Sequence, residues 1–391
     1  MMRSFVPPRA LPSLVALLSL TMGAASLGAQ PATLVYRLGK DTLAIEQFTR
    51  TATAMTGEMV QRSGAAVVRI AYNVTLGKDG RPTTATVKRM QADGSIQANA
   101  PRETRFQIGA DSIVREVVWA DSTQRRAFAA RQALINFPVF VYGPTELLAN
   151  IKRAGGPVDS IPALGLAGTL GYTGFSAAGG DSVRLRGGAY QMVLRFDANS
   201  RLMSLDGSLT TNKAIATRGT GVADIAAIAR GMKPTGVLSV RENVRAAFGP
   251  GGMVVVDYGR PQVRERSVWG GTLVPFDSVW RAGANDATHL FTTRVLTLGA
   301  GEVTLQPGMY TLWVQHTRGG TFLIVNKQTG QWGTQYDAAQ DAGRVKMTSA
   351  ATANHVEEFT IAVRALAGNR GALEMSWGPT AMSVPFTVSA R

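Results

Sequence analysis

The feature that most restricts the fold of this chain is a period of two in its apolar side chains. In residues 68–76, apolar residues occupy every second position, with Arg, Ala, Asn and Thr between them. That period is typical of a β-strand with one buried face. Residues 77–80 contain turn-forming Gly and Asp, and residues 82–90 return as a partner strand. Residues 190–205 repeat the pattern, so the first part of the chain is predicted to be antiparallel β.

Three short helices are expected within this β-rich part. Asp121 or Ser122 is suited to cap a helix that runs to about Ile135. Thr145 is suited to cap a second helix, which stops before residues 155–157, and a third covers residues 224–230. Residues 163–180 are rich in Gly and small side chains and are expected to form a loop or lid. The prediction is a bent antiparallel sheet with a few helices.

The rest of the chain is predicted to be a separate β-domain. Residues 248–252 read Phe-Gly-Pro-Gly-Gly and are typical of a linker. Beyond them, short strands recur every eight to twelve residues, and five of the six tryptophans lie here. This spacing favours a β-sandwich or jelly-roll-like fold with an aromatic core. We therefore expect a leader at 1–29, an N-terminal domain at 30–247, a linker at 248–252 and a C-terminal domain at 253–391.

The first 29 residues have the order of a secretory signal peptide. Arg3 and Arg9 form a basic start, residues 11–22 are apolar, and small residues follow. We expect cleavage after Ala29, with Ala25 as the alternative. About 12 apolar residues are too few to span a bilayer, which needs about 20. The prediction is a mature protein without a transmembrane segment, exported to the periplasm or the medium of a bacterium.

Composition excludes several classes of chemistry. The chain has no cysteine and three histidines, which argues against disulfides, thiolate zinc sites, cysteine nucleophiles and a multi-histidine metal centre. It also lacks a P-loop and other cofactor motifs, so no metal or cofactor is predicted. The net charge of +15 comes mainly from scattered arginines, without the clustered aromatics of a nucleic-acid reader. Solvated strand faces explain them best, with an anionic envelope surface as a possible partner.

One segment, residues 258–286, stands out by mixing charged side chains with Trp, Gly and Pro. Arginine offers a planar fork for carboxylate or phosphate, and tryptophan gives it a face for stacking. We therefore predict a site for a small anionic or sugar-like ligand in the C-terminal domain. Its candidate residues are Arg260, Trp269, Trp280, Arg281, Asn285 and Asp286.

The same segment resembles family 2911 of the domains of unknown function, secreted bacterial β-domains. The resemblance rests on Tyr-Gly-Arg-Pro at 258–261 and Trp-Arg-Ala-Gly-Ala-Asn at 280–285. Gln262, Phe276 and Asp286 stand where the family commonly has Ser, Tyr and Glu. The resemblance covers about residues 254–388 and implies a fold but no activity. Further matching residues are Pro307, Gly308, Tyr310, Thr311, Leu312, Asn326, Trp332, Gly333, Tyr336, Arg344 and Trp377.

Three alternatives to ligand binding stay open at this point. In a hydrolase, Asp286 or His289 would act as a general base and Arg281 as an anion clamp, although residues 286 and 289 should face opposite sides of a strand. In a purely structural site, Arg281 would pair with a carboxylate while Asn285 bonds its own backbone in a turn. A structural or interaction module of the cell envelope would show a broad exposed apolar patch.

Overall fold

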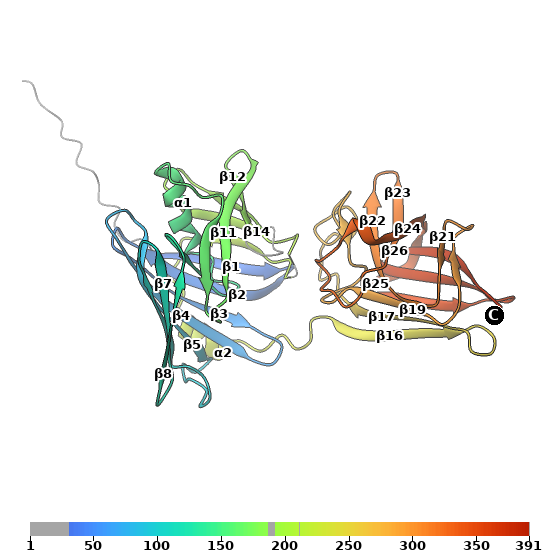
Figure 1. The fold of residues 1–391 in the computed structure, drawn as a ribbon, viewed down its shortest axis with the longest axis horizontal. Helices are drawn as coiled ribbons and strands as arrows, with labels where there is room; N and C mark the ends of the chain where they lie inside the picture. The colour runs from blue at the N-terminus through green and yellow to red at the C-terminus, as the bar shows by residue number, and fades with distance from the viewer. Residues whose placement is uncertain (1–30, 187–191, 211, 391) are drawn as a thin grey trace, which may run out of the picture.

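The computed structural model describes residues 31–186, 192–210 and 212–390. The expected signal peptide lies outside these residues. The described chain is mainly β, as predicted, and it forms two halves that Figure 1 shows side by side. Two α-helices are present among the described residues, α1 Thr145–Arg153 and α2 Ile225–Gly231, and neither is long and apolar enough to cross a membrane.

The first half is one large sheet. Its order is β8-β7-β6-β5-β4-β3-β2-β1-β15-β14-β13-β12-β11-β10-β9, antiparallel except for the β9–β10 pair, and it bends round α1 (Figure 1). The strands are β1 Pro31–Leu38, β2 Asp41–Arg50, β3 Ala54–Arg62, β4 Val67–Leu76, β5 Pro82–Gln91, β6 Glu103–Ile108, β7 Ser112–Val118, β8 Thr123–Ala129, β9 Leu134–Asn136, β10 Ile161–Gly165, β11 Leu170–Gly179, β12 Ser182–Arg186, β13 Met192–Phe196, β14 Leu202–Asp206 and β15 Ile215–Gly219.

The alternating pattern builds the strands that it predicts. In β4, Ile70, Tyr72 and Val74 are buried in the main core of this half, and β5 pairs with β4 through the predicted turn. The Asp79 side chain accepts a hydrogen bond from the backbone N–H of Arg81 at 3.0 Å and closes that turn. A period of two therefore fixes both the strand and its buried face.

Two expectations for this half are wrong. The helix expected over residues 121–135 is instead strand β8 followed by β9. The helical spacing of Phe128, Arg131 and Leu134 was too weak a signal against the pairing of β8 with β7. The loop expected over residues 163–180 is the hairpin of β10 and β11. Its glycines permit close packing, since a Cβ on Gly174 would lie 2.3 Å from the carbonyl oxygen of Asp159.

The other two predicted helices are present. In α1, Leu147, Leu148 and Ile151 pack into the main core beneath the sheet. In α2, the Asp224 side chain accepts a hydrogen bond from the backbone N–H of Ala227 at 2.9 Å and caps the first turn. Thr145 does not cap α1, because Pro144 is the N-cap residue and no side chain caps this helix.

The second half consists of two packed sheets. The larger has the order β16-β17-β19-β22-β23-β24, with β18 also paired to β22, and the smaller has the order β21-β20-β26-β25. The elements are β16 Val240–Ala247, β17 Met253–Arg260, β18 Val279–Trp280, β19 Thr288–Thr292, β20 Leu296–Leu298, β21 Val303–Leu305, β22 Gly308–Thr317, β23 Gly320–Asn326, the 3-10 turn η1 Ala338–Gln340, β24 Asp341–Lys346, β25 Thr348–Ala365 and β26 Arg370–Val388.

An aromatic core joins these two sheets, as the sequence suggested. Trp280 stacks on Trp377 with ring centroids 5.3 Å apart, and Phe359 meets both rings edge-on. Trp280, Trp377 and Phe359 are all buried. Large flat rings fill the space between sheets at little cost in side-chain entropy, so they set the spacing of the sandwich.

The segment expected to be a linker, residues 248–252, lies instead in the turn that joins β16 to β17. The Phe248 N–H donates to the Gly252 carbonyl at 2.8 Å, and a Cβ on Gly252 would lie 2.0 Å from the Phe248 carbonyl oxygen. Gly and Pro deny both helix and ladder, but they suit a tight hairpin as well as a linker. The chain passes between the two halves in the segment from α2 to β16.

Candidate functional site

A buried arginine without a matching acid lies at the centre of the candidate site. Arg281 directly follows β18 and its side chain is 6% exposed. Its Nε has no hydrogen-bond partner, and its Nη1 reaches the Gly333 carbonyl at 3.5 Å, the outer limit for a hydrogen bond. Among the described residues, no carboxylate forms a salt bridge with it. A buried guanidinium in this state is costly to the fold.

Local backbone geometry holds Arg281 in this position. A Cβ on Gly333 would lie 2.0 Å from Cδ of Arg281, so only glycine leaves room for the arginine stem. The Gly333 N–H donates to the Asn285 carbonyl at 3.0 Å. Ala282 and Asn285 both have positive φ angles, 48° and 62°, which non-glycine residues rarely adopt. The Trp-Arg-Ala-Gly-Ala-Asn segment and Trp-Gly at 332–333 therefore meet around one side chain.

Arg281 lines two adjoining hollows between the halves of the molecule, which we call the basic cleft. The hollows have volumes of about 120 and 240 Å³ and share Lys213, Leu273, Trp280 and Arg281. The first also contains Arg264, Arg266 and Asn285. None of the residues described as lining either hollow is an aspartate or a glutamate. The cleft thus gathers cations without acids to neutralise them within it.

Lys213 reaches the cleft from the first half, in the loop between β14 and β15. Its ammonium donates to the Ser208 carbonyl at 2.8 Å, and its backbone has a positive φ of 48°. Burial, followed by the positive charges of Arg281 and Arg266, lowers the pKa of Lys213 to about 7. Burial likewise lowers the pKa of Arg281 to about 10. Both pKa values are lowered, as expected for buried cations, and in Lys213 two neighbouring cations add to the effect of burial.

Arg266 is held in the cleft by backbone groups. Its Nε donates to the Val263 carbonyl at 2.9 Å and its Nη2 to the Gln262 carbonyl at 2.7 Å. Burial and the neighbouring Arg264 lower its pKa to about 10. Arg264 is paired with Asp41 of the first half. Backbone carbonyls orient Arg266 without removing its charge.

The candidate tryptophans form the wall behind these cations. Trp280 and Trp377 line the first hollow, and Trp313 lines the second. Trp269 is half-buried, donates its indole N–H to the Trp377 carbonyl at 3.2 Å and meets Trp280 edge-on at 6.0 Å. Trp269 therefore supports the wall, whereas Trp280 contacts the cleft.

Arg260, another candidate, is engaged within the sandwich. Its guanidinium forms salt bridges of 3.2 Å to both Glu242 and Glu358 and donates to the hydroxyl of Thr360 at 3.2 Å. The arginine–carboxylate buttress considered for Arg281 is thus found at Arg260, and the buttress expectation for Arg281 itself is wrong. Glu242 lies on the adjacent strand β16 and Glu358 on β25 of the other sheet, so the alternation along β17 revealed neither partner.

Asp286 lies in a different hollow from Arg281. Its side chain is 55% exposed and 4.0 Å from Arg241, in an open depression that His289 also lines. The expectation that residues 286 and 289 face opposite sides is wrong, because β19 begins at Thr288 and Asp286 precedes its alternation. Nε2 of His289 accepts a hydrogen bond from the Gly330 N–H at 2.9 Å, and Nδ1 lies 3.5 Å from Nη2 of Arg241.

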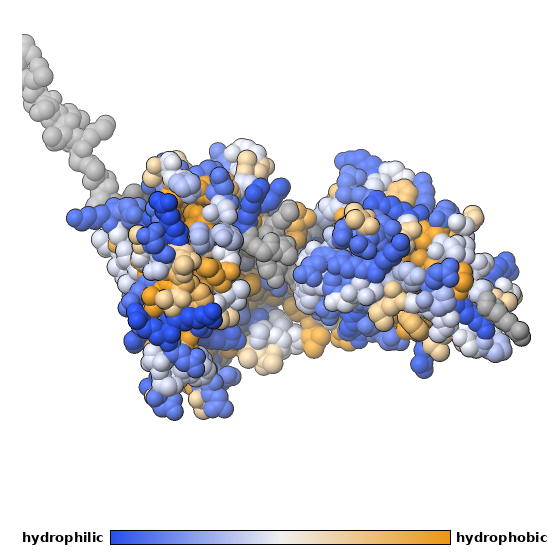
Figure 2. All heavy atoms as spheres, in the orientation of Figure 1, coloured by the Kyte–Doolittle hydropathy of each residue, from blue (hydrophilic) through white to orange (hydrophobic). Residues whose placement is uncertain are grey.

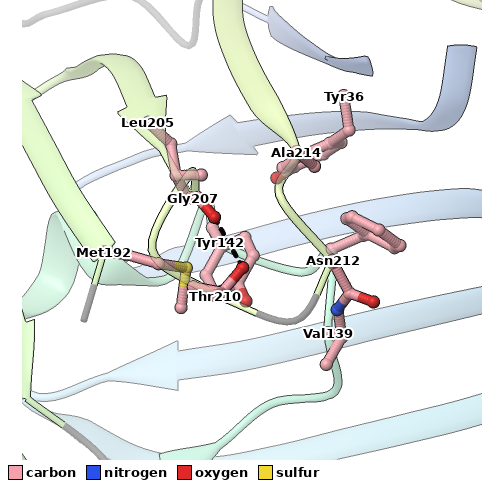
Figure 3. A pocket seen from close by; sticks show the side chains of 10 residues that line it. Tyr36, Val139, Tyr142, Met192, Leu205, Gly207, Thr210, Asn212 and Ala214 are labelled. Carbon is pink, nitrogen blue, oxygen red and sulfur yellow. Dashed lines mark hydrogen bonds between the residues drawn. The ribbon is translucent and has the colours of Figure 1, made fainter. Parts of the chain in front are cut away.

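An apolar pocket in the first half adjoins the cleft. Figure 3 shows Tyr36, Met192, Leu205 and Ala214 around it, from β1, β13, β14 and the loop before β15. Its side chains leave room for about one water molecule, a volume of about 20 Å³. The Thr210 hydroxyl donates to the Gly207 carbonyl at 2.7 Å, drawn as a dashed line. Thr210 and Asn212 line this pocket and also the basic cleft.

Sequence reasoning missed the contribution of the first half. Arg266 was part of the unusual segment but was not chosen as a site residue, and nothing in the residues around Lys213 indicated a site. The loop that carries Lys213 is buried against the other half of the molecule, and such long-range burial leaves no pattern in the neighbouring sequence. Within the described ranges, no group of three His, Asp or Glu side chains is arranged to hold a metal ion.

Comparisons with known proteins give one family match, which lies in the second half. No curated protein matches the chain. A solved structure, a DUF1089 family protein from Pseudomonas aeruginosa, is 12% identical, with a TM-score of 0.30, over 42% of this chain and 90% of that one. The N-terminal part matches no family. Residues 239–386, the strands that surround Arg281, match the family described as protein of unknown function DUF2911.

Proposed function

We propose that this protein binds a small anionic molecule in the basic cleft without transforming it. The observation that carries the proposal is Arg281, whose buried Nε has no partner in a cleft that also contains Lys213 and Arg266. A buried arginine normally has its N–H groups paired with carboxylate or phosphate oxygens. A bound anion would provide those oxygens.

The energetics of the cleft favour an anion over a neutral ligand. A hydrogen bond to a charged group contributes about 1.5–3 kcal/mol, and more is gained where a buried donor would otherwise stay unsatisfied. In the free protein, Arg281 and Arg266 repel the ammonium of Lys213, because both cations lower the pKa of Lys213. An anion among them converts repulsion into attraction. A neutral sugar would satisfy Nε but leave that repulsion in place.

The arrangement favours binding over hydrolysis. The hydrolase hypothesis needs Asp286 beside Arg281, and these two side chains line different hollows. The alternative base, His289, has Nε2 bonded to the Gly330 N–H at 2.9 Å and Nδ1 facing the Arg241 guanidinium at 3.5 Å. A general base must reach its proton through a free nitrogen or oxygen.

Export of the protein is part of the proposal. The basic start, the apolar stretch at 11–22 and the small residues before Gln30 support a cleaved signal peptide. Mass spectrometry of protein purified from the native compartment should show a chain that begins at Gln30, or at Ser26 for the alternative cleavage. A chain that begins at Met1 in the cytoplasm would remove this part of the proposal.

Calorimetric titration with phosphate, sulfate and glucose tests the binding function. We expect phosphate and sulfate to bind and glucose not to bind. Arg281→Met should weaken anion binding at least tenfold, because it removes the buried fork. Arg245→Met is the matched control, since Arg245 is an exposed arginine of β16 outside the cleft. Equal loss in both variants, or tighter binding of glucose than of phosphate, would contradict the proposal.

A further inference from the structure

Lys213 brings a primary amine to the anion-binding groups of the basic cleft. It is half-buried and lines both hollows together with Arg281. Its ammonium donates to the Ser208 carbonyl at 2.8 Å, without a salt bridge to any carboxylate of the described residues. The other seven lysines of the chain lie outside the residues that line the two hollows. Figure 2 shows hydrophilic surface on the side of the second half that faces the first half.

The surroundings of Lys213 favour the neutral form of its amine. Burial, followed by the positive charges of Arg281 and Arg266, lowers its pKa to about 7, so a large share of the amine is unprotonated at neutral pH. A lysine amine attacks a carbonyl carbon only when it is neutral, and a neighbouring cation is one means by which proteins activate it. With one N–H on the Ser208 carbonyl, the neutral nitrogen still has a lone pair to offer.

We propose that Lys213 holds the ligand through a reversible imine, so that the ligand is a small anion with an aldehyde or ketone group and its charged end lies on Arg281. This inference rests on the proposed binding function and names the class of ligand. The simplest members of that class are 2-oxo acids. Hydrolysis of the imine returns the ligand unchanged, so the protein still binds the ligand without transforming it.

The imine forms from the amine, the carbonyl group and one proton from solvent, with release of water. The neutral Nζ of Lys213 bonds to the carbonyl carbon, and one of its two protons moves to the carbonyl oxygen. That oxygen takes a second proton from solvent and leaves as water, while the nitrogen lone pair forms the C=N bond. The protonated imine keeps one N–H, which suits the single hydrogen bond to the Ser208 carbonyl.

Arg281 supplies the partner for the charged end of such a ligand. Its buried Nε has no hydrogen-bond partner, and arginine N–H groups pair strongly with carboxylate and phosphate oxygens. No aspartate or glutamate lines either hollow to compete for it, and volumes of about 120 and 240 Å³ admit an acid of a few carbon atoms. An anion held on Arg281 keeps its carbonyl group in the hollow that Lys213 also lines, which favours bond formation.

Reductive trapping is the first experiment. The whole protein is incubated with pyruvate and sodium cyanoborohydride in triethanolamine–chloride buffer, which contains neither phosphate nor a primary amine. Reduction of the imine leaves a stable carboxyethyl group on the lysine, which peptide mass spectrometry locates. We expect Lys213 to be modified about tenfold faster, or more, than the exposed Lys233 and Lys327. Excess inorganic phosphate should protect Lys213 alone, because it occupies Arg281.

Calorimetric titration then compares pyruvate with lactate, which has the same carboxylate but a hydroxyl group in place of the ketone. The wild type should bind pyruvate about tenfold more tightly than lactate, or more. Lys213→Arg keeps a cation in the cleft but has no primary amine. It should bind pyruvate no more tightly than lactate, with phosphate affinity within about threefold of the wild type. Lys327→Arg is the matched control and should leave the preference for pyruvate unchanged.

The outcomes separate the imine from the anion site. If phosphate binds but pyruvate forms no adduct on Lys213, or binds no more tightly than lactate, the imine inference fails and the anion site stands. An adduct spread evenly over the lysines, or one that forms as fast in Arg281→Met as in the wild type, also overturns the inference. If phosphate, pyruvate and lactate all fail to bind, the proposed function itself fails.

Discussion

The two halves of the molecule differ in how completely one buried charge in each of them, Glu146 and Arg281, is hydrogen-bonded. In the first half, Glu146 on α1 accepts hydrogen bonds from Arg218 at 2.7 Å and from the Leu202 N–H at 2.9 Å, and pairs with Arg50 at 3.3 Å. In the second half, Arg281 is as fully enclosed but its Nε has no partner. Burial alone therefore does not distinguish a structural charge from a binding residue, whereas the completeness of its hydrogen bonds does.

Glu46, like Glu146, has partners for both of its carboxylate oxygens. It is fully buried, and its two carboxylate oxygens accept from the hydroxyls of Tyr36 and Tyr72 at 2.7 and 2.8 Å and from the N–H groups of Tyr142 and Gly143. These bonds tie β2 to its neighbour β1, to β4 beyond β3 and to the chain before α1. The first half thus uses its buried acids to hold its bent sheet together, and the second half keeps a buried base free.

The strongest test of this contrast is Glu146→Ala. The substitution leaves Arg50 and Arg218 largely buried beside each other without an acid. Breaking a buried pair in this way costs about 3–5 kcal/mol. Urea unfolding followed by circular dichroism should show that loss in the free energy of unfolding. A change below about 1 kcal/mol would mean that the network is not structural.

The second test uses the pH dependence of stability. Burial raises the pKa of Glu46 to about 7 from 4.5. The folded state therefore holds this proton more tightly than the unfolded state between pH 4.5 and 7. Through this group, the free energy of unfolding should fall as the pH rises across that window, by about 3 kcal/mol in total. Glu46→Gln, unfolded in parallel at each pH, should lack this slope, and an identical slope in both proteins would contradict the assignment.

The third test is expected to change the free energy of unfolding in the opposite direction from the first. Arg281→Met removes a buried charge that has no acid to leave behind. We expect the free energy of unfolding in phosphate-free Tris–chloride buffer to stay equal or rise, by up to about 2 kcal/mol. Arg260→Met, which breaks pairs with Glu242 and Glu358, should instead lower it by about 1 kcal/mol. If Arg281→Met destabilises as much as Arg260→Met, Arg281 is structural.

The lowered pKa of Lys213 makes anion binding in the cleft depend on pH. Its pKa is lowered to about 7 from 10.5, so the unfolded state binds the extra proton between those values. Through this group the free energy of unfolding rises as the pH rises from 7 to 10.5. A bound anion favours charged Lys213 and opposes this trend. The stabilisation by phosphate, measured as a shift in Tm, should therefore be larger at pH 6 than at pH 9, and Lys213→Met should reduce that difference.

Much of the fold and part of the site could be predicted from the sequence. Alternation located β4 and β5, and short apolar runs that end at glycine located α1 and α2, because these signals are local. The unusual segment also gave Arg281 and Trp280, whose chemistry lies in adjacent residues. What local patterns do not carry is pairing at a distance. Arg260 is neutralised by carboxylates on other strands, and Lys213 reaches the cleft from another half of the molecule.

The smallest expected effect belongs to Asp286, which lines the depression beside Arg241 and His289 and not the basic cleft. Its exposed carboxylate makes a single long ion pair, 4.0 Å to Arg241. Exposed pairs of this kind contribute at most about 1 kcal/mol. Asp286→Asn should therefore change the free energy of unfolding by less than about 0.5 kcal/mol and leave phosphate affinity in the cleft within twofold. If the substitution weakened phosphate binding tenfold, Asp286 would act on Arg281, and the division between the basic cleft and the Arg241–His289 depression would be wrong.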